Sequence, residues 1–87
     1  MMANVTVRYW AAAKNAAGIG EEKVEASTLA DLIDQIERRH ADAARFGDVI
    51  GMCSILIGQT PVGARDHGTV VLTDGDTVEF LPPFAGG

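Results

Sequence analysis

The stretch from residue 28 to residue 40 constrains the fold most, because it has the clearest helical period in the sequence. Its apolar residues fall at positions i, i+3, i+4 and i+7, which form one stripe of an α-helix: Leu29, Leu32, Ile33 and Ile36. Thr28 is a favourable N-cap, and Asp31 in the first turn complements the helix dipole. We therefore expect one amphipathic helix, whose apolar stripe must be covered by another layer of the protein.

Segments on both sides of this helix have the features of β-strands. The expected strands are residues 5–10, 21–26, 52–57 and 77–81, with a short extended piece near Val62. A Thr-Asp-Gly-Asp turn at residues 73–76 precedes the last strand. We expect a short helical or irregular link at residues 11–17. Residues 41–51 are expected to be a linker with at most one helical turn, at residues 43–46.

The order strand, strand, helix, strand, short strand, strand predicts an α+β fold. In this fold a single mixed sheet carries one main helix on one face, and the first and last strands are parallel neighbours at its centre. Periodicity alone supports nothing narrower than an α+β roll. A chain of 87 residues is enough for one small domain, which we expect to span residues 1–81.

Charge and composition narrow the classes of partner. The net charge is −5 and no basic stripe is present, so nucleic acid is not an expected partner. No run approaches the roughly 20 apolar residues of a membrane span, and no basic segment followed by an apolar stretch marks a signal peptide. Cys53 is the only cysteine and lies in an apolar run, so we expect a buried, unreactive thiol. A cytoplasmic location follows as the expectation.

Side chains suited to catalysis are sparse. His40 and His67 have no cysteine or histidine at metal-ligand spacing, so neither a metal nor a bound cofactor is expected. A nucleophilic pair of Cys53 with a histidine is disfavoured by the apolar setting of the thiol. The carboxylates of residues 21–22 are interpreted as a solvated strand edge, and those of Asp74 and Asp76 as part of a turn. The sequence therefore predicts no catalytic pocket within the body of the protein.

The printed sequence ends in an apolar, proline-stiffened stem followed by two glycines. Pro82, Pro83, Phe84 and Ala85 precede Gly86 and Gly87, and no charged side chain follows Glu79. Glycine passes through narrow clefts because it has no Cβ atom, and proline reduces the entropy lost when a stem is threaded into a channel. We expect residues 82–87 to be a flexible tail whose terminal carboxylate enters the active site of another protein.

Alternation also predicts an apolar patch beside this tail. If Val7 and Val78 face the helix, Trp10 and Leu81 point to the opposite face of the sheet. Large apolar side chains clustered near a functional terminus are typical of a protein–protein interface. The alternative is that Trp10 folds over residues 11–17 and packs internally.

The segment from Leu72 to Gly87, with its Thr-Asp-Gly-Asp turn and Pro-Pro-Phe-Ala-Gly-Gly end, resembles the molybdopterin synthase small subunit (MoaD) family. The strand end at residues 7–11 and the turn at residues 57–60 are also similar, although Gly58 replaces the usual asparagine and Phe84 the common valine. The resemblance implies the ubiquitin-like β-grasp fold and a sulfur carrier. In such a carrier the terminal glycine is adenylated, becomes a thiocarboxylate, and gives its sulfur to cyclic pyranopterin monophosphate in molybdenum cofactor biosynthesis.

Carried onto this sequence, the resemblance makes Gly87 the sulfur-bearing end. Residues 84–86 line the partner's channel, and the matching positions that pack on the large subunit are Trp10, Pro61 and Leu81. The implied partners are the large synthase subunit, in a heterotetramer, and an activating enzyme that uses ATP. The chain itself is then a sulfur-donor subunit of a sulfurtransferase, with no catalytic pocket of its own.

Three alternatives stay open from the sequence. The same tail suits a sulfur carrier for thiamine or cysteine biosynthesis, although those tails usually lack the Pro-Pro stem. It also suits a ubiquitin-like modifier that forms isopeptide bonds with lysines. The third alternative is a β-grasp binding module with an incidental tail.

Overall fold

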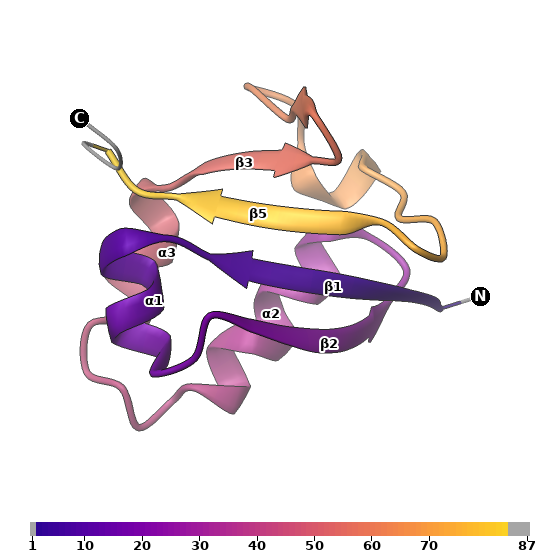
Figure 1. Ribbon diagram of the computed structural model, residues 1–87. Coiled ribbons are helices and arrows are strands. Elements are labelled where there is room, and N and C mark those ends of the chain that lie inside the picture. The colour runs from indigo at the N-terminus through magenta and orange to yellow at the C-terminus, as the bar shows by residue number, and fades with distance from the viewer. Residues whose placement is uncertain (1, 84–87) are drawn as a thin grey trace.

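Two strands that are far apart in the sequence pair at the centre of the sheet. In the computed structural model, which describes residues 2–83, β1 (Ala3–Tyr9) and β5 (Thr77–Leu81) are parallel neighbours with Val7 opposite Val78. The strand order is β2-β1-β5-β3-β4 (Figure 1). The predicted parallel pairing of the first and last strands is confirmed.

The outer strands complete a mixed sheet. On one side, β2 (Glu21–Ala26) pairs antiparallel with β1. On the other side, β3 (Ser54–Ile57) pairs antiparallel with β5, and the two-residue strand β4 (Thr60–Pro61) pairs with β3. The expected extended piece near Val62 is therefore the short strand β4, which ends one residue earlier.

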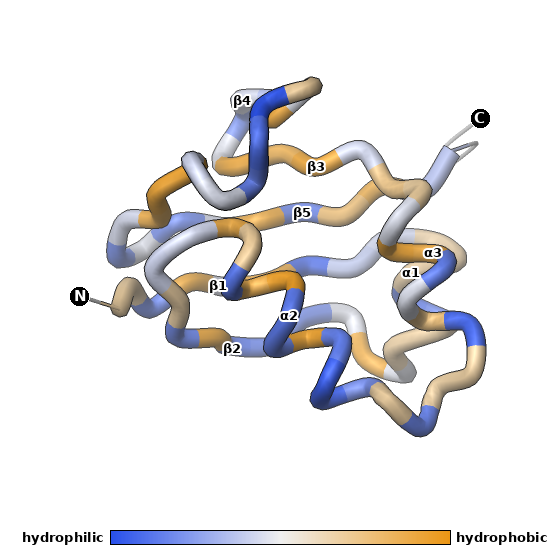
Figure 2. Tube along the Cα trace, turned by 180° about the vertical axis from the view of Figure 1, so that it is seen from behind, coloured by the Kyte–Doolittle hydropathy of each residue, from blue (hydrophilic) through white to orange (hydrophobic). Residues whose placement is uncertain are grey.

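The helices lie on one side of this sheet, as the opposite views of Figures 1 and 2 show. The main helix is α2 (Leu29–Arg39), and the Oγ1 atom of Thr28 accepts the expected capping hydrogen bond from the Asp31 amide at 3.2 Å. Its apolar stripe faces the sheet, since Leu32 and Ile36 are fully buried. Two shorter helices, α1 (Ala11–Ala17) and α3 (Phe46–Met52), lie together at the end of the sheet where β1 and β5 finish.

The core lies between the sheet and these helices. Each of its largest fully buried side chains contributes roughly 1.5–3 kcal/mol through removal from water. They come from the three strands β1, β2 and β5 and the two helices α2 and α3: Val5, Val7, Val24, Leu29, Leu32, Ile36, Phe46, Val78 and Phe80. Alternate residues of β1 and β5 point away from this core, as the predicted period of two requires.

The linker predicted at residues 41–51 is wrong in its second half. Phe46, Val49 and Ile50 are buried and stand at i, i+3 and i+4, so they form the apolar face of α3. The two glycines in this segment hide the helical pattern because glycine is a poor helix former. As a result β3 begins at Ser54 and not at Met52, which belongs to α3 and is 57% exposed.

The turn before β5 is built as predicted. Gly75 has a φ of 89°, which glycine adopts without strain. The carboxylate of Asp74 accepts a hydrogen bond from the Asn4 amide at 2.7 Å, and that of Asp76 accepts one from the Thr73 amide at 2.8 Å. These two carboxylates therefore hold the turn, which confirms the structural interpretation of the pair. A short 3-10 helix, η1 (His67–Thr69), lies before this turn.

Candidate functional site

The candidate site lies at the end of the sheet where β1 and β5 finish together. Because the two strands are parallel, with Tyr9 opposite Phe80, their carboxyl ends are at the same edge of the molecule. Trp10 follows β1 there, and Pro82 and Pro83 follow β5 (Figure 1). Pro82 is buried and Pro83 is exposed. The root of the predicted tail is thus fixed to the body by the last residues of the central strand.

Trp10 lies on the outer face of the sheet, the face opposite the helices. Its side chain is 40% exposed, and its indole Nε1 donates a hydrogen bond to a carboxylate oxygen of Glu79 at 2.9 Å. The guanidinium carbon of Arg8 lies 5.1 Å from the centre of the indole ring, a cation–π contact worth about 0.5–1 kcal/mol at an exposed site. The alternative of internal packing is therefore wrong, and the indole is held on the surface.

A row of side chains crosses the outer face in register. Arg8 is opposite Glu79, Glu79 is opposite Leu56, and Leu56 is opposite Pro61. Pro61 is exposed and Leu56 is half-buried. The structure thus places the predicted contact residues Trp10 and Pro61 on one face, with Trp10 just after β1 and Pro61 on the edge strand β4.

Leu81 is half-buried and lies opposite Ser54 of β3, one row closer to the tail. Leu56 is a half-buried residue that the sequence analysis did not single out, because it lies in the middle of the apolar run Ile55-Leu56-Ile57. Neighbouring residues of a strand point to opposite faces, so the position of Leu56 next to the buried Ile55 was the feature that could have placed it on the outer face. We name the set Trp10, Leu56, Pro61 and Leu81 the outer apolar patch.

The remaining predicted site residues are outside the part of the chain that the structure describes. These are Phe84, Ala85, Gly86 and Gly87. Their roles, and the boundary placed at residue 82, stay predictions. The buried position of Pro82 shows that the first residue of the predicted tail is packed against the body.

Glu22 is the centre of a polar cluster. The sequence analysis assigned residues 21–22 to a solvated edge, which is wrong for Glu22, whereas Glu21 is exposed. The Glu22 side chain is only 13% exposed. It accepts a hydrogen bond from the Tyr9 hydroxyl at 2.5 Å, pairs with the imidazole of His40 at 2.6 Å and forms an ion pair with Arg39 at 3.0 Å. The cluster joins β1, β2 and the carboxyl end of α2.

The hydrogen bonds of this cluster set its electrostatics. Burial by itself would raise the pKa of Glu22, but the hydrogen bonds from Tyr9, His40 and Arg39 together outweigh it and hold the pKa of this carboxyl below its ordinary value. Burial and the hydrogen bond to Glu22 raise the pKa of Tyr9. The charged carboxylate of Glu22 therefore links β1, β2 and the end of α2, and both of its oxygens have hydrogen-bond partners.

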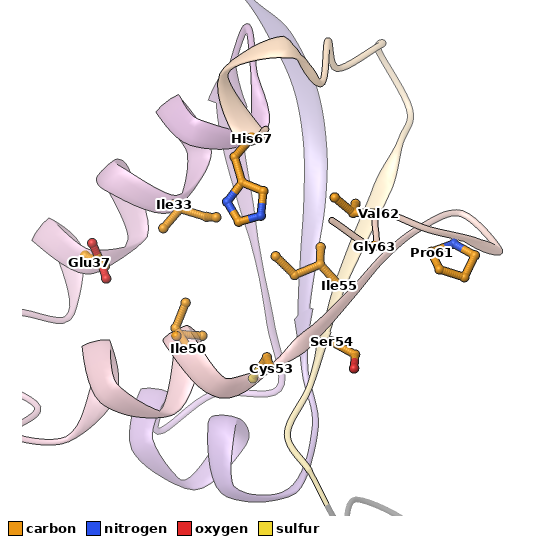
Figure 3. Close-up of a pocket in the computed structure, with 11 residues that line it drawn as sticks. Ile33, Glu37, Ile50, Cys53, Ser54, Ile55, Pro61, Val62, Gly63 and His67 are labelled. Atoms are coloured by element: carbon orange, nitrogen blue, oxygen red, sulfur yellow. The ribbon is translucent and has the colours of Figure 1, made fainter. Parts of the chain in front are cut away.

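A cavity of about 550 Å³ lies between α2, α3 and β3 (Figure 3). The imidazole of His67 points into it toward the apolar side chains of Ile33 and Ile55, and Cys53 lies at its lower wall. The Cys53 thiol donates to the carbonyl of Val49 at 3.2 Å, and burial raises the pKa of this thiol to about 11. A thiol with such a pKa is a poor nucleophile at neutral pH.

Within residues 2–83, no three His, Cys, Asp or Glu side chains lie together in a way that suits a metal ion. No helix in this part of the chain is long and apolar enough to cross a membrane.

The sequence matches a described protein family from residue 7 to residue 87, which includes the strand end at Trp10 and the whole of the Gly-Gly tail. The chain belongs to the ThiS family. This membership fits a ubiquitin-like sulfur carrier or modifier. Among curated protein sequences, none matches significantly.

Solved structures support the β-grasp fold of this ThiS-family chain. The solution structure of small archaeal modifier protein 1 from Methanosarcina acetivorans is 24% identical, with a TM-score of 0.80 and coverage of 100% of this chain and 99% of that one. A putative molybdopterin converting factor subunit 1 from Pyrococcus furiosus is 29% identical, with a TM-score of 0.73 and coverage of 93% and 98%. A complex of molybdopterin-converting factor subunits 1 and 2 from Helicobacter pylori matches at 26% identity and a TM-score of 0.67, over 100% of both chains.

Proposed function

We propose that this protein is a sulfur carrier that acts as the small subunit of a molybdopterin synthase. In this role the carboxylate of Gly87 is converted to a thiocarboxylate, which donates its sulfur to cyclic pyranopterin monophosphate during molybdenum cofactor biosynthesis. The reaction takes place in the cytosol. The sulfur-donor subunit supplies the reagent, and the partner proteins supply the catalytic pockets.

The observation that carries this proposal is the construction of the tail root. Parallel pairing of β1 and β5 brings Trp10 and Leu81 to the end of the sheet from which Pro82 and Pro83 depart. A partner that takes the tail therefore meets an apolar, proline-stiffened stem beside an exposed indole. The similarity to molybdopterin converting factor subunit 1 of Pyrococcus furiosus and of Helicobacter pylori supports the choice of pathway.

The chemistry needs two steps before sulfur transfer. First, an oxygen of the Gly87 carboxylate attacks the α-phosphorus of ATP on an activating enzyme, and pyrophosphate leaves. Second, hydrosulfide attacks the acyl carbon, AMP leaves, a proton is lost, and a thiocarboxylate is formed. Glycine favours both steps because no α side chain crowds the carbonyl. ATP is thus a substrate of the partner, and the carrier binds no cofactor in this scheme.

Two partners follow from the proposal. One is the adenylating enzyme, and the other is the large synthase subunit, with which the chain forms a heterotetramer. The Helicobacter pylori structure is a complex of subunits 1 and 2, and this supports a large-subunit partner for the present chain. The outer apolar patch is the surface on which we place that subunit.

The test is reconstitution with purified components. The protein is first isolated from its native host, and its intact mass is measured for replacement of one terminal oxygen by sulfur. The thiocarboxylate form is then mixed with a molybdopterin synthase large subunit and the pterin precursor. We expect a dithiolene product from the full chain and none from a variant lacking Gly86 and Gly87.

The alternatives give different results in the same experiments. Transfer of sulfur to a thiamine or cysteine precursor, with no dithiolene formed, would assign the carrier to another pathway. Recovery of the chain joined covalently to lysines of many proteins would identify a ubiquitin-like modifier. Pathway function that survives deletion of the two glycines would leave only a binding module.

A further inference from the structure

A groove lies on the helix side of the tail root, opposite the outer apolar patch. It has a volume of about 440 Å³ and lies between α1, α3 and the two prolines that follow β5. Its lining comes from three segments of the chain: Ala12, Asn15 and Ala16; Arg45, Val49 and Met52; Pro82 and Pro83. We call it the tail-root groove.

The lining is apolar and open to solvent. Val49 is buried at its floor, while Met52 is 57% exposed at its wall. The alanines of α1 leave room because they have the smallest side chains that a helix normally carries. An exposed methionine is an adaptable contact, since its unbranched thioether side chain fits partners of irregular shape. The groove therefore suits apolar side chains such as those of leucine, methionine or phenylalanine.

Arg45 gives the groove a charge of its own. It is exposed at the start of α3 and forms no ion pair with any residue of the described part of the chain. Arg8, Lys14, Lys23 and Arg65 of the described chain also form no ion pair, so what distinguishes Arg45 is its position at an apolar rim. A carboxylate on an approaching protein complements this position.

The length of the tail limits how far from the groove a partner protein can bind. Only four residues lie between Pro83 and the end of Gly87. Fully extended, they reach at most about 13–14 Å. If the Gly87 carboxylate is to enter a pocket inside another protein, that protein must lie against the surface around Pro83. This surface includes both the end of the outer face and the tail-root groove.

We propose that the tail-root groove is a docking site for the adenylating enzyme that activates Gly87. An apolar side chain of that enzyme enters the groove, and an acidic side chain beside it pairs with Arg45. The proposal rests on the proposed function, because it assumes that Gly87 is activated. Among the partners in the proposed function, the adenylating enzyme is the one that must take the tail first, because the Gly87 carboxylate is activated before any sulfur is transferred.

The proposal is tested with Met52→Ala and a matched control, Met2→Ala. Both methionines are 57% exposed, but Met2 is at the opposite end of β1 from the tail root. The probe is the adenylating enzyme of the source organism. It is purified by following its ATP–pyrophosphate exchange activity, measured with the wild-type chain as the substrate. Exchange must depend on Gly87, as shown by a variant lacking the two glycines. Thermal unfolding of both variants confirms that the fold is intact.

We expect Met52→Ala to raise the chain concentration that gives half-maximal exchange by about five- to tenfold, as for a contact residue of an interface. The maximal exchange rate and the Met2→Ala values stay unchanged. Arg45→Ala is expected to raise the same concentration and to reduce its dependence on salt, because a charge pair at an interface is screened by ions.

Equal half-saturating concentrations for the wild type, Met52→Ala and Met2→Ala would overturn the proposal while leaving the proposed function in place. Absence of Gly87-dependent exchange with the wild-type chain would refute the proposed function and the groove proposal together. The methyl resonance of Met52 in the free protein distinguishes other occupants. A shift on deletion of residues 84–87 would assign the groove to the chain's own tail, and a shift with concentration would assign it to a second copy; either result would overturn the proposal.

Discussion

The Glu22 cluster leads to a prediction that can be worked through from the structure. Glu22→Gln keeps the shape of the side chain but removes the charge that Tyr9, His40 and Arg39 surround. Hydrogen bonds to a charged group are worth roughly 1.5–3 kcal/mol, and the amide would also direct donor hydrogens toward the Arg39 donor. Because Arg39 is 42% exposed, its ion pair is screened by water and adds little. We expect a loss of about 2 kcal/mol at neutral pH, mainly from the bonds to Tyr9 and His40.

The pH dependence of this loss follows from the pKa of Glu22. The folded-state pKa lies below the ordinary value of 4.5, so the stability that it contributes is fully present above pH 4.5 and is lost as the pH falls through the folded-state pKa. The difference between wild type and Glu22→Gln is therefore largest near neutral pH and shrinks below pH 4.5. In a domain of this size, 2 kcal/mol corresponds to a decrease in melting temperature of roughly 8–16 °C.

The assay is urea unfolding followed by circular dichroism across this pH range, with thermal melting alongside. Glu21→Gln is the matched control, because Glu21 is the neighbouring carboxylate on β2 and is exposed. We expect it to change the free energy of unfolding by less than about 0.5 kcal/mol. A Glu22→Gln loss that is the same at pH 3 and pH 7, or no larger than that of Glu21→Gln, would refute the electrostatic reasoning.

Four further outcomes are expected. Trp10→Ala should weaken binding of the large subunit by about 1–3 kcal/mol in a titration, as for an interface anchor, and unchanged affinity would remove the outer apolar patch from the interface. Gly87→Ala should impair sulfur transfer while changing stability by less than about 0.5 kcal/mol, and a large fall in melting temperature would contradict this. Cys53 should react with iodoacetamide at pH 8 at least about tenfold more slowly than a free cysteine, because its raised pKa lowers the thiolate fraction more than it raises nucleophilicity, and equal rates would show an unperturbed thiol. Leu32→Ala should cost about 2–5 kcal/mol of unfolding free energy in urea, since its side chain is fully buried, and a loss below 1 kcal/mol would mean that the core closes around the cavity.

Local periodicity is sufficient for β1, β5 and the main helix. The alternation of β1 and β5 predicts that Trp10 and Leu81 lie on the outer face. The helix α3 was missed because Gly47 and Gly51 lower its intrinsic propensity, and burial of Phe46 against the core outweighs that loss. Tertiary packing, not local preference, decides this element.

The two features that alternation did not reveal depend on long-range contacts. Glu22 lies two residues before the buried Val24, so the alternation of β2 does predict that its side chain points inward. Its partners Tyr9 and His40, however, lie 13 and 18 residues away in the sequence. The tail-root groove likewise forms only where α1, α3 and the two prolines after β5 meet, and no local sequence pattern predicts that meeting.

The position of β5 has a consequence for biosynthesis. This strand is the last along the described chain, yet it lies between β1 and β3 and holds the two halves of the sheet together. A nascent or truncated chain that lacks it has two separate strand pairs with unpaired edges, which invite aggregation. Closing the centre of the sheet joins residues about seventy positions apart in the sequence, and contacts of such long range are typical of slower folding. The sheet of the described chain therefore cannot close until the strand that leads to Pro82 and Pro83 is in place.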